Sequence, residues 1–551
     1  MKEFFKKIFR RGNIIKRRNE KFLKRIQKDL LQWESGQESR KKVRILYGPS
    51  FAIYQTCFLH DRVMAAALRL RGAQIVPVYC DSVQSVECNY WGGVWGGGSD
   101  FAKNCSNCAQ TSKELWKNSP VVPITFSRHL EESDIRAARE KAENLGPGDW
   151  SRYEEDGLPF GSWAKDILIN NYVVGDYSLV PDHEFLGTVH LTNLLMLKTV
   201  YERILDESRP DRVVSNDSYY GMWALLQKLS ERRDIPFYSN WEGSRRGAWC
   251  YALNDASMNL DMSSAWVGFE KGSLDERQKN KVFQWLEDRR TGEEMVFDTA
   301  SLAEHQDVEA DMSTYDSEKP TALLVSNVIW DLAALNKQIV FSDMIDWIIE
   351  TIEWFRQHPQ YQLIVKPHPA ELSPAIPETR ERVGTALEIR RIELPDNVLL
   401  LSPKSKITVY QLFDLTDVVL THTSTVGIEM AANGKPVVTT ANSPYRNFGF
   451  TYDPEDRSEY FSLLKRILEG ENGHPDRDIQ VDLACKFILL FWYHYYMKLD
   501  ILDYTHGETA RFKVESLKDI IPGKNIYLDY VADSIIDGLP ILSATRCPPE
   551  S

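Results

Sequence analysis

The chain has 551 residues, of which 43% are hydrophobic and 26% are charged, and its formal net charge is −13. This composition is typical of a soluble globular protein and excludes a disordered chain, while the acidic balance argues against a general nucleic-acid binder. No apolar run approaches the roughly 18 residues that a membrane-spanning helix needs. At this length we expect two domains of about 200 to 250 residues with extensions.

Residues 1–42 form a basic arm with apolar residues spaced among its cations. Residues 1–44 hold 16 Lys and Arg against 5 Asp and Glu, which leaves 50 basic and 74 acidic residues in the rest of the chain. This pattern suits a helix that lies on an anionic membrane face, and a solvated helix with frayed ends is an equally good interpretation. Because the arm lacks the features of a secretory signal, we expect a cytoplasmic protein, peripheral at the inner membrane face if the arm binds lipid.

Four of the eight cysteines lie close together in the sequence: Cys80, Cys88, Cys105 and Cys108. Without an export signal, a disulfide framework is not expected. The Cys105-x-x-Cys108 spacing lets two thiolates hold one tetrahedral Zn²⁺, and Cys80 or Cys88 could complete a structural zinc site. The gaps of seven and sixteen residues match no standard zinc module, so unconnected thiols are the slightly favoured alternative.

The first half of the chain opens as a β-α-β unit. A strand at 42–47 is followed by a helix at 56–71 and a second strand at 72–79, which is the start of a doubly wound sheet. The tryptophan- and glycine-rich segment 91–98 follows no clear strand, and it predicts a flexible loop over a cleft rather than a dinucleotide-binding turn.

Two later strands of this half deliver carboxylates to their carboxyl ends. The strand at 210–217 ends in Asp217, and the strand at 235–240 is followed by Glu242. Residues 288–319 are rich in acidic and hydroxyl residues and lack apolar periodicity, as an interdomain linker would. We therefore expect an N-terminal domain at 43–287 and an acidic linker at 288–319.

From residue 320 the alternation of strands and helices resumes, which predicts a second α/β domain at 320–455. Its expected elements are strands at 321–327, 362–365, 398–401, 417–420 and 434–439, a long amphipathic helix at 342–357, a helix at 409–415 and a helix that begins at Thr425.

Polar motifs follow two of these buried strands. Lys366, His368 and Pro369 follow the first, and Ser424 and Thr425 follow the second. In an open α/β sheet, the carboxyl ends of adjacent strands face one crevice, which is where ligands bind. A helix N-terminus, two hydroxyl donors, a lysine charge and an imidazole fixed by flanking prolines suit a phosphate. The sequence therefore predicts one site for an anionic ligand.

Two further residues of this half are candidates for the same site. Glu429 lies one helical turn beyond Thr425, where it could accept hydrogen bonds from a ribose or from an adjacent loop; the alternative is that it caps backbone groups. Arg446 lies on a loop at the rim of the crevice and could reach a diphosphate or a sugar; the alternative is an exposed surface arginine.

The motifs Lys-Pro-His-Pro at 366–369, Thr-x-x-Ser-Thr-Val-Gly-x-Glu at 421–429 and Gly-Lys-Pro-Val-Val at 434–438 resemble those of the capsule polysaccharide biosynthesis family of bacterial glycosyltransferases. This family includes Kdo transferases and is similar to polysialyltransferases. The resemblance covers residues 320–455 well and the N-terminal half loosely. It implies a GT-B fold, in which two Rossmann-like doubly wound α/β domains face a cleft and residues 456–551 form helices that brace the N-terminal domain.

The resemblance also implies an activity. The protein would be a metal-independent, inverting glycosyltransferase that moves a sugar from a nucleotide-sugar donor to a growing surface polysaccharide or a lipid-linked glycan. The nucleotide phosphate would bind at His368, Pro369, Ser424 and Thr425. An inverting transfer needs a base for the acceptor hydroxyl; Glu242 is the first choice and Asp217 the second, and the alternative for either is a cap on the next helix.

The charge that grows on the leaving nucleotide would be stabilised by Lys366, His368 and the helix N-terminus, so no cofactor is required. Two other classes of function fit the sequence. A sugar-nucleotide 2-epimerase or a polyol-phosphate transferase would keep the fold and change the reaction. A non-catalytic scaffold of a polysaccharide assembly complex would use the basic arm as its anchor.

Overall fold

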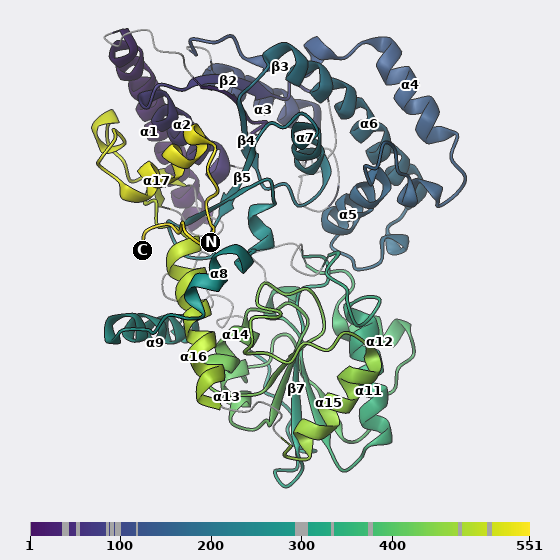
Figure 1. Ribbon diagram of the computed structural model, residues 1–551. Helices are drawn as coiled ribbons and strands as arrows, with labels where there is room; N and C mark the ends of the chain where they lie inside the picture. Colours follow the sequence, from purple (N-terminus) through teal and green to yellow (C-terminus); the bar gives the residue numbers. More distant parts are fainter. Residues whose placement is uncertain are drawn as a thin grey trace. The chain divides into compact units, whose positions relative to one another are not determined.

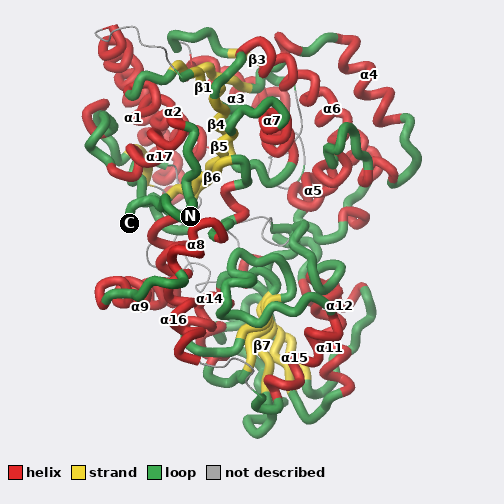
Figure 2. Tube along the Cα trace, viewed as in Figure 1, coloured by secondary structure: helices red, strands yellow, loops and turns green. Residues whose placement is uncertain are grey.

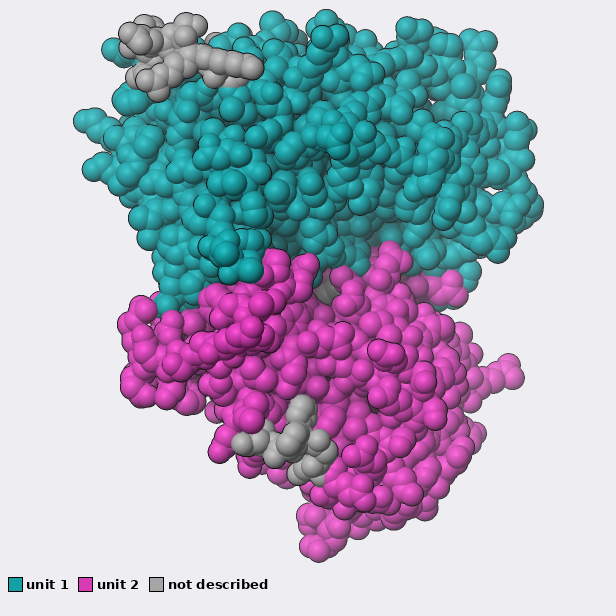
Figure 3. Space-filling model, in the orientation of Figure 1, with its two compact units in different colours: residues 1–171, 177–260, 493–551 teal, residues 172–176, 261–492 magenta. Residues whose placement is uncertain are grey.

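The computed structural model describes residues 2–35, 43–50, 55–83, 88, 93, 101–116, 119–291, 307–331, 335–372, 378–471, 477–503 and 510–551. The chain divides into two compact units, coloured separately in Figure 3. Unit 1 consists of Met1–Asn171, Tyr177–Leu260 and Tyr493–Ser551, and unit 2 consists of Tyr172–Asp176 and Asp261–Trp492. Of the predicted loop at 91–98, all but Gly93 lies outside the described residues.

The described residues of unit 1 form a six-stranded sheet in the order β3-β2-β1-β4-β5-β6 (Figure 1). The first five strands are parallel, and only β6 runs antiparallel to its neighbour β5. The strands are β1 (Arg44–Tyr47), β2 (Gln74–Tyr79), β3 (Ile124–Thr125), β4 (Arg212–Asn216), β5 (Phe237–Glu242) and β6 (Trp249–Leu253). They are almost entirely buried, as strands with helices on both faces must be.

Helices connect and flank these strands. They are α2 (Gln55–Leu70), α3 (Phe101–Trp116), α4 (Glu132–Glu143), α5 (Phe160–Tyr172), α6 (His183–Ser208), α7 (Gly221–Glu231) and α17 (Ile526–Asp537), with short helical turns η1 (Ser127–His129), η2 (Asp149–Arg152), η3 (Tyr177–Leu179), η4 (Ser257–Asn259) and η7 (Leu517–Asp519). A small antiparallel hairpin of β12 (Leu502–Asp503) and β13 (Arg511–Phe512) belongs to the same unit.

The basic arm is a helix, α1 (Lys2–Ser35), that packs on α2, β13 and η7 of unit 1 (Figure 1). Phe22, Leu23, Ile26 and Leu30 recur at helical spacing and are buried. This part of the apolar stripe is therefore neither laid on a membrane nor frayed in solvent, and both sequence interpretations need correction for it. The cations of the described side chains, by contrast, are exposed.

The described residues of unit 2 form a five-stranded parallel sheet in the order β11-β10-β7-β8-β9. The strands are β7 (Thr321–Val325), β8 (Gln362–Lys366), β9 (Val398–Leu400), β10 (Val418–Thr421) and β11 (Val437–Thr439). Figure 2 shows these yellow strands with red helices around them. The expected fold class, two Rossmann-like doubly wound sheets with a basic helical arm, is confirmed.

The helices of unit 2 are α8 (Ser263–Phe269), α9 (Glu276–Thr291), α11 (Met344–Gln357), α12 (Val383–Ile389), α13 (Val409–Phe413), α14 (Val426–Ala432), α15 (Arg457–Leu468) and α16 (Arg477–Ile488), with the turn η5 (Pro369–Leu372). The π-helical turn η6 (Leu489–Tyr495) follows α16 and runs from unit 2 into unit 1. The aromatic side chains from Phe487 to Tyr493 are buried.

The unit boundaries differ from those that the composition predicted. Unit 2 begins at Asp261, so α8 and α9 belong to it rather than to an N-terminal domain at 43–287. Unit 2 also includes Tyr172–Asp176, whose backbone is held by Glu381: its Oε2 accepts hydrogen bonds from the N–H groups of Gly175 and Asp176 at 2.9 and 3.0 Å. Within 456–551, only Tyr493–Ser551 lies in unit 1.

None of the helices in the described part of the chain combines the length and the apolar character that a bilayer crossing requires.

Candidate functional site

The polar motifs of the second half meet at the carboxyl edge of the unit 2 sheet. Strand register places Lys366 of β8 beside Val325 of β7, and Val325 beside Thr421 of β10. The segments after these strands also touch, since the N–H of Thr423 donates to Asn327 Oδ1 at 3.2 Å. The chain leaves β7 toward β8 on one side and reaches β10 on the other, so this is the switch point of the sheet, where ligands bind in open α/β folds.

Lys366 is the last residue of β8, and its side chain is only 1% exposed. Its Nζ lies 3.4 Å from the carbonyl oxygen of Ser405, which is a long hydrogen bond. Burial lowers the pKa of Lys366 to about 8, so the ammonium form predominates at neutral pH. A buried cation without a close acceptor is costly for a protein to keep, and an anionic ligand at this edge would relieve that cost.

Further buried polar atoms surround the same edge. The hydroxyls of Ser326, after β7, and Ser405, after β9, make no hydrogen bond within the described structure, and neither does Nε2 of His422, after β10. Buried polar groups are normally paired, so a group left open at a ligand edge calls for an explanation. Together with Lys366, these atoms follow four neighbouring strands and can receive a polar ligand.

His368 is half-buried, two residues beyond β8. Its Nδ1 accepts a hydrogen bond from the N–H of Ala370 at 3.1 Å, which leaves the ring proton on Nε2. Desolvation, together with the positive charges of Arg289 and Lys366, lowers the pKa of His368 to about 4. The imidazole is therefore neutral at pH 7 and offers one N–H donor, as the phosphate prediction requires.

The loop from Thr421 to Gly427 is shaped by a tyrosine from the next strand connection. The hydroxyl of Tyr445 donates to the carbonyl of Ser424 at 2.6 Å and lies 3.1 Å from Thr421 Oγ1. A Cβ on Gly427 would lie 2.4 Å from that hydroxyl, so the close approach of Tyr445 explains the glycine in this motif. The loop thereby holds Ser424, which is buried, and Thr425, which is half-buried, at the carboxyl edge.

The expected anion-binding helix N-terminus is weaker than predicted. The helix α14 has only seven residues, and its first N–H groups are already engaged. Gly427 N donates to the Ser424 carbonyl, Ile428 N to the Thr425 carbonyl, and Val426 N to Ser424 Oγ at 3.4 Å. The positive charge of this edge therefore comes from side chains more than from a helix dipole.

Arg289 is a member of the site that the sequence interpretation missed. It lies near the end of α9, and its Nη2 donates to Thr425 Oγ1 at 3.2 Å. Its Nε donates to Glu429 Oε1 at 2.8 Å, while the hydroxyl of Tyr410 donates to Glu429 Oε2 at 2.7 Å. Glu429 thus binds two side chains of unit 2, which corrects both the ribose and the backbone-cap interpretations. The Arg289–Arg290 pair at the end of a polar helix is the sequence signal that could have been followed.

Arg446 does not face the edge as a ligand-binding side chain. It is 7% exposed, and its guanidinium donates to the carbonyl oxygens of Thr439, Asp453 and Pro454 at 2.6 to 3.0 Å. The side chain ties together the loop that follows β11. Neither a diphosphate contact nor an exposed surface arginine describes this position.

The two predicted catalytic carboxylates lie in unit 1. Asp217 follows β4 and is buried; its Oδ1 accepts hydrogen bonds from Ser257 Oγ and Met258 N, both at 3.0 Å. Asp217 thus caps the turn η4 rather than the helix that follows β4. Glu242 is the half-buried last residue of β5, which continues through a hairpin into β6. The next element after Glu242 is therefore a strand and not a helix.

The four cysteines proposed for zinc belong to unit 1. Cys105 is buried on α3, while Cys80, Cys88 and Cys108 are half-buried. Among the described residues, no group of three or more His, Cys, Asp or Glu side chains is positioned to hold a metal ion. The structure therefore lends no support to a zinc site.

Comparison with known sequences gives a match in the second half of the chain. Residues 299–466 match the profile of a family described as capsule polysaccharide biosynthesis protein. This segment is similar to the capsule polysaccharide biosynthesis family. The match includes the motifs around Lys366 and Ser424 and confirms the resemblance that those motifs indicated, over less than half of the chain. No curated protein sequence matches the chain.

Solved structures that are similar to this chain share little sequence with it. The beta Kdo 2,4 transferase of Thermosulfurimonas dismutans KpsC has 13% identity and a TM-score of 0.30, and the alignment covers 52% of this chain and 79% of the other. The beta Kdo 2,7 transferase of the same protein has 16% identity and a TM-score of 0.30, and the alignment covers 58% of this chain and 88% of the other. A UDP-GlcNAc 2-epimerase from Neisseria meningitidis has 11% identity and a TM-score of 0.23, and the alignment covers 82% of this chain and 99% of the other. Similarities this low do not assign an activity.

Proposed function

We propose that the protein is a glycosyltransferase that moves a sugar from a nucleotide-sugar donor to a growing bacterial surface polysaccharide, such as a capsule. The donor phosphate binds at the carboxyl edge of the unit 2 sheet. The acceptor, a glycan or a lipid-linked glycan, presents one hydroxyl to the anomeric carbon of the donor.

The observation that carries the proposal is the buried Lys366 at the switch point of a sheet inside the capsule-family segment. Within the described residues, its ammonium group has one acceptor, a carbonyl oxygen at 3.4 Å, although burying a weakly paired charge is costly. A phosphate oxygen would supply the missing acceptor. The open hydroxyls of Ser326 and Ser405 provide further donors beside it.

His368 gives the phosphate a directional contact. Because its Nδ1 is occupied by the Ala370 N–H, its Nε2–H is the atom left to donate to a phosphate oxygen. A neutral imidazole keeps this donor through the physiological pH range, whereas Lys366 supplies the net charge. Arg289 adds positive potential near His368, although its guanidinium is largely neutralised by Glu429.

The reaction follows from where charge develops. As the bond between the anomeric carbon and the donor phosphate breaks, negative charge grows on the leaving nucleotide, and Lys366 and His368 stabilise it. This role does not need a metal ion. For inversion at the anomeric carbon, a carboxylate takes the proton of the attacking hydroxyl, and Glu242 remains our first choice because one oxygen of Asp217 is used to cap η4.

A location at the inner face of the membrane is part of the same proposal. Lys16, Arg17, Arg18, Lys21 and Lys24 of α1 are all exposed, and they give one end of an acidic protein a surface that attracts anionic lipid.

A nucleotide titration tests the donor site. We expect CMP, CDP or UDP to raise the melting temperature of the protein, since a ligand that binds only the folded state stabilises it by mass action. His368→Ala should weaken the preferred nucleotide about tenfold or more, because a hydrogen bond to a charged group is lost. His358→Ala is the matched control, because His358 is half-buried in the same unit but lies before β8 rather than after it. The affinity of this variant for the nucleotide should equal that of the wild type.

A labelled nucleotide sugar then separates the possible activities. Transfer of label to an added glycan supports the proposal. Interconversion of the free nucleotide sugar without an acceptor would replace it with an epimerase. Absence of nucleotide preference together with unchanged binding in His368→Ala would replace it with a scaffold.

A further inference from the structure

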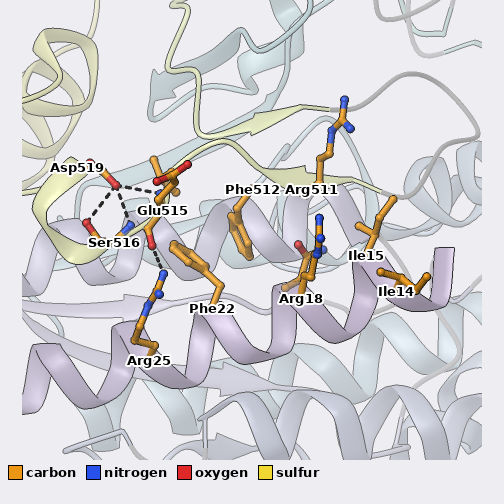
Figure 4. A pocket seen from close by; sticks show the side chains of 12 residues that line it. Ile14, Ile15, Arg18, Phe22, Arg25, Arg511, Phe512, Glu515, Ser516 and Asp519 are labelled. Carbon is orange, nitrogen blue, oxygen red and sulfur yellow. Dashed lines mark hydrogen bonds between the residues drawn. The ribbon is translucent and has the colours of Figure 1, made fainter. Parts of the chain in front are cut away.

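A cavity lies in unit 1, far along the chain from the donor motifs. Its volume is about 800 Å³, and it is lined by α1 on one side and by β13 and the residues after it on the other (Figure 4). The lining residues are Ile14, Ile15, Arg18, Asn19, Phe22, Arg25, Arg511, Phe512, Val514, Glu515, Ser516 and Asp519. The cavity therefore depends on the two ends of the chain.

Three contacts hold α1 against the C-terminal segment around this cavity. The rings of Phe22 and Phe512 pack with their centroids 4.4 Å apart. The buried Asn19 donates through Nδ2 to the carbonyl of Ala510 at 2.8 Å, and Arg25 donates to the carbonyl of Glu515. The walls are thus fixed by the fold itself.

The lining combines an apolar side with arginines that differ in their engagement. Arg511 is paired with Asp503, and Arg25 is held by Glu515. Arg18 makes no hydrogen bond or ion pair within the described part of the chain, and it stands between Ile15 and Phe22 in α1. The acidic Asp519 is occupied by the N–H groups of Glu515 and Ser516. Among the three arginines of the lining, Arg18 is therefore the one whose guanidinium is left to meet an anionic ligand, in a lining that also includes the carboxylate of Glu515.

The surroundings indicate an extended anionic surface rather than a single small anion. Ile14 at the rim is 56% exposed, although it is a large apolar side chain. Lys16, Arg17, Lys21 and Lys24 continue the exposed cationic surface along the same helix. A cavity that combines apolar side chains with an unpaired arginine, set in a cationic surface, matches a phospholipid, whose phosphate and acyl chain carry both kinds of group.

We propose that this cavity binds the phosphate headgroup of an anionic membrane lipid, with Arg18 as the phosphate contact and Ile14, Ile15 and Phe512 against the start of the acyl chain. The arm then contacts the membrane through a formed site and not through Phe22, Leu23, Ile26 and Leu30, which are buried in unit 1. The inference is independent of the transfer reaction, because it needs no donor and no acceptor.

The test is sedimentation of the full chain with vesicles, without any nucleotide. We expect binding to vesicles of phosphatidylcholine with phosphatidylglycerol and little binding to phosphatidylcholine alone. Arg18→Gln should lower the apparent affinity about tenfold or more, as expected for a lost hydrogen bond to a charged group. Arg17→Gln is the matched control on the same helix; it lies outside the cavity and should lose only the roughly fivefold that one surface charge contributes.

Several results would overturn the inference. Equal losses in Arg17→Gln and Arg18→Gln would show a diffuse cationic surface. Equal binding to both kinds of vesicle would show that the protein does not recognise the charge of the headgroup. Competition by free glycerol phosphate at low concentration would identify a soluble ligand. Unchanged melting temperatures of both variants establish that they are folded, which is expected because both arginines are exposed.

Discussion

The five strands of the unit 2 sheet have the same order as the first five strands of the unit 1 sheet, and the two sheets are built alike at their amino edges. Before β4, Asp211 accepts a hydrogen bond from the N–H of Arg44 in β1; before β10, Asp417 accepts one from Thr321 in β7, at 2.7 and 2.8 Å respectively. In both units the aspartate N–H also donates back to the same strand, at 2.8 Å. The same two-way clip therefore joins the first and fourth strands of each sheet.

The similarity continues to the next strand. A residue with positive φ, Asp234 in unit 1 and Gly434 in unit 2, ends the helix, and a proline two residues later accepts a hydrogen bond from the preceding strand. These proline carbonyls, of Pro236 and Pro436, lie 2.9 and 3.0 Å from their donors. The backbone plan of the two halves is thus the same although their sequences differ.

The carboxyl edges differ in charge and in closure. In unit 1 the edge carries Asp217 and Glu242, and the hairpin to β6 closes one side, with Trp249 donating to Asn240 Oδ1 at 2.9 Å. In unit 2 the edge carries Lys366, and no hairpin follows its strands within the described residues. The two sheets therefore share hydrogen bonds at their amino edges and differ in the side chains at their carboxyl edges. The unit 1 edge carries carboxylates, and the unit 2 edge carries a lysine.

The largest expected effect concerns acid stability, which the two units should share. Burial lowers the pKa of His190 in unit 1 and of His422 in unit 2 to about 4, from an ordinary value of 6.5. Between pH 6.5 and 4, each histidine binds a proton in the unfolded chain but not in the folded chain. The contribution of the neutral histidine to the free energy of unfolding is therefore fully present above pH 6.5 and is lost as the pH falls toward 4. Each histidine contributes up to about 3 kcal/mol.

Urea unfolding between pH 7 and 5 checks this, with hydrogen exchange to follow each unit. His190→Gln and His422→Gln should each flatten the pH dependence of their own unit. If only one unit loses stability in acid, the proposed equivalence of the two buried histidines is wrong.

The next effect separates the carboxyl edges. Lys366→Gln should weaken nucleotide binding about tenfold to a hundredfold at pH 7, because a buried charged hydrogen bond to phosphate is removed. Asp217→Asn, at the edge of the other sheet, should leave that affinity unchanged. Isothermal titration measures both, and an equal loss in the two variants would contradict the assignment of the phosphate to unit 2.

The same lysine predicts a pH profile. The phosphate favours the ammonium form of Lys366, whose pKa is about 8 in the empty site, so nucleotide affinity should decline as the pH rises through that value. The decline should be missing in Lys366→Gln. A decline of the same size in the variant would assign it to another group.

The smallest effect concerns the shared amino-edge clip. Asp211→Ala and Asp417→Ala should each lower the free energy of unfolding by about 1 kcal/mol, because one backbone N–H loses its acceptor. Asp211→Asn and Asp417→Asn retain an acceptor oxygen and should recover most of that loss in denaturant unfolding. A loss confined to one aspartate would show that the clips are equivalent in geometry only.

Much of unit 2 could be predicted from the sequence because its buried strands are continuous apolar runs. The strand that ends at Lys366 and the long helix at 342–357 correspond to β8 and α11 within two residues. Parallel pairing then places Lys366 and the loop after Thr421 on one edge. That juxtaposition needed only strand positions and the rule that ligands bind where the strands end.

Other features depended on contacts between segments that are distant in sequence. Arg289 was assigned to a linker because α9 has little apolar periodicity, and only its contacts with Thr425 and Glu429 reveal its place. The apolar stripe of α1 has the same spacing whether it covers a membrane or a protein surface, so Phe22 and Leu30 could not decide between them. The burial of Arg446 could not be predicted either, because it depends on hydrogen bonds to backbone carbonyls that the sequence does not show.

The short segment Tyr172–Asp176, held by Glu381, has a practical consequence for anyone who wishes to separate the halves. No single cut yields two complete pieces: a break at Leu260 deprives one fragment of these five residues and the other of everything from Tyr493 onward. Unit 1 therefore takes chain from both sides of the 261–492 segment, so a fragment that ends at Leu260 lacks part of it.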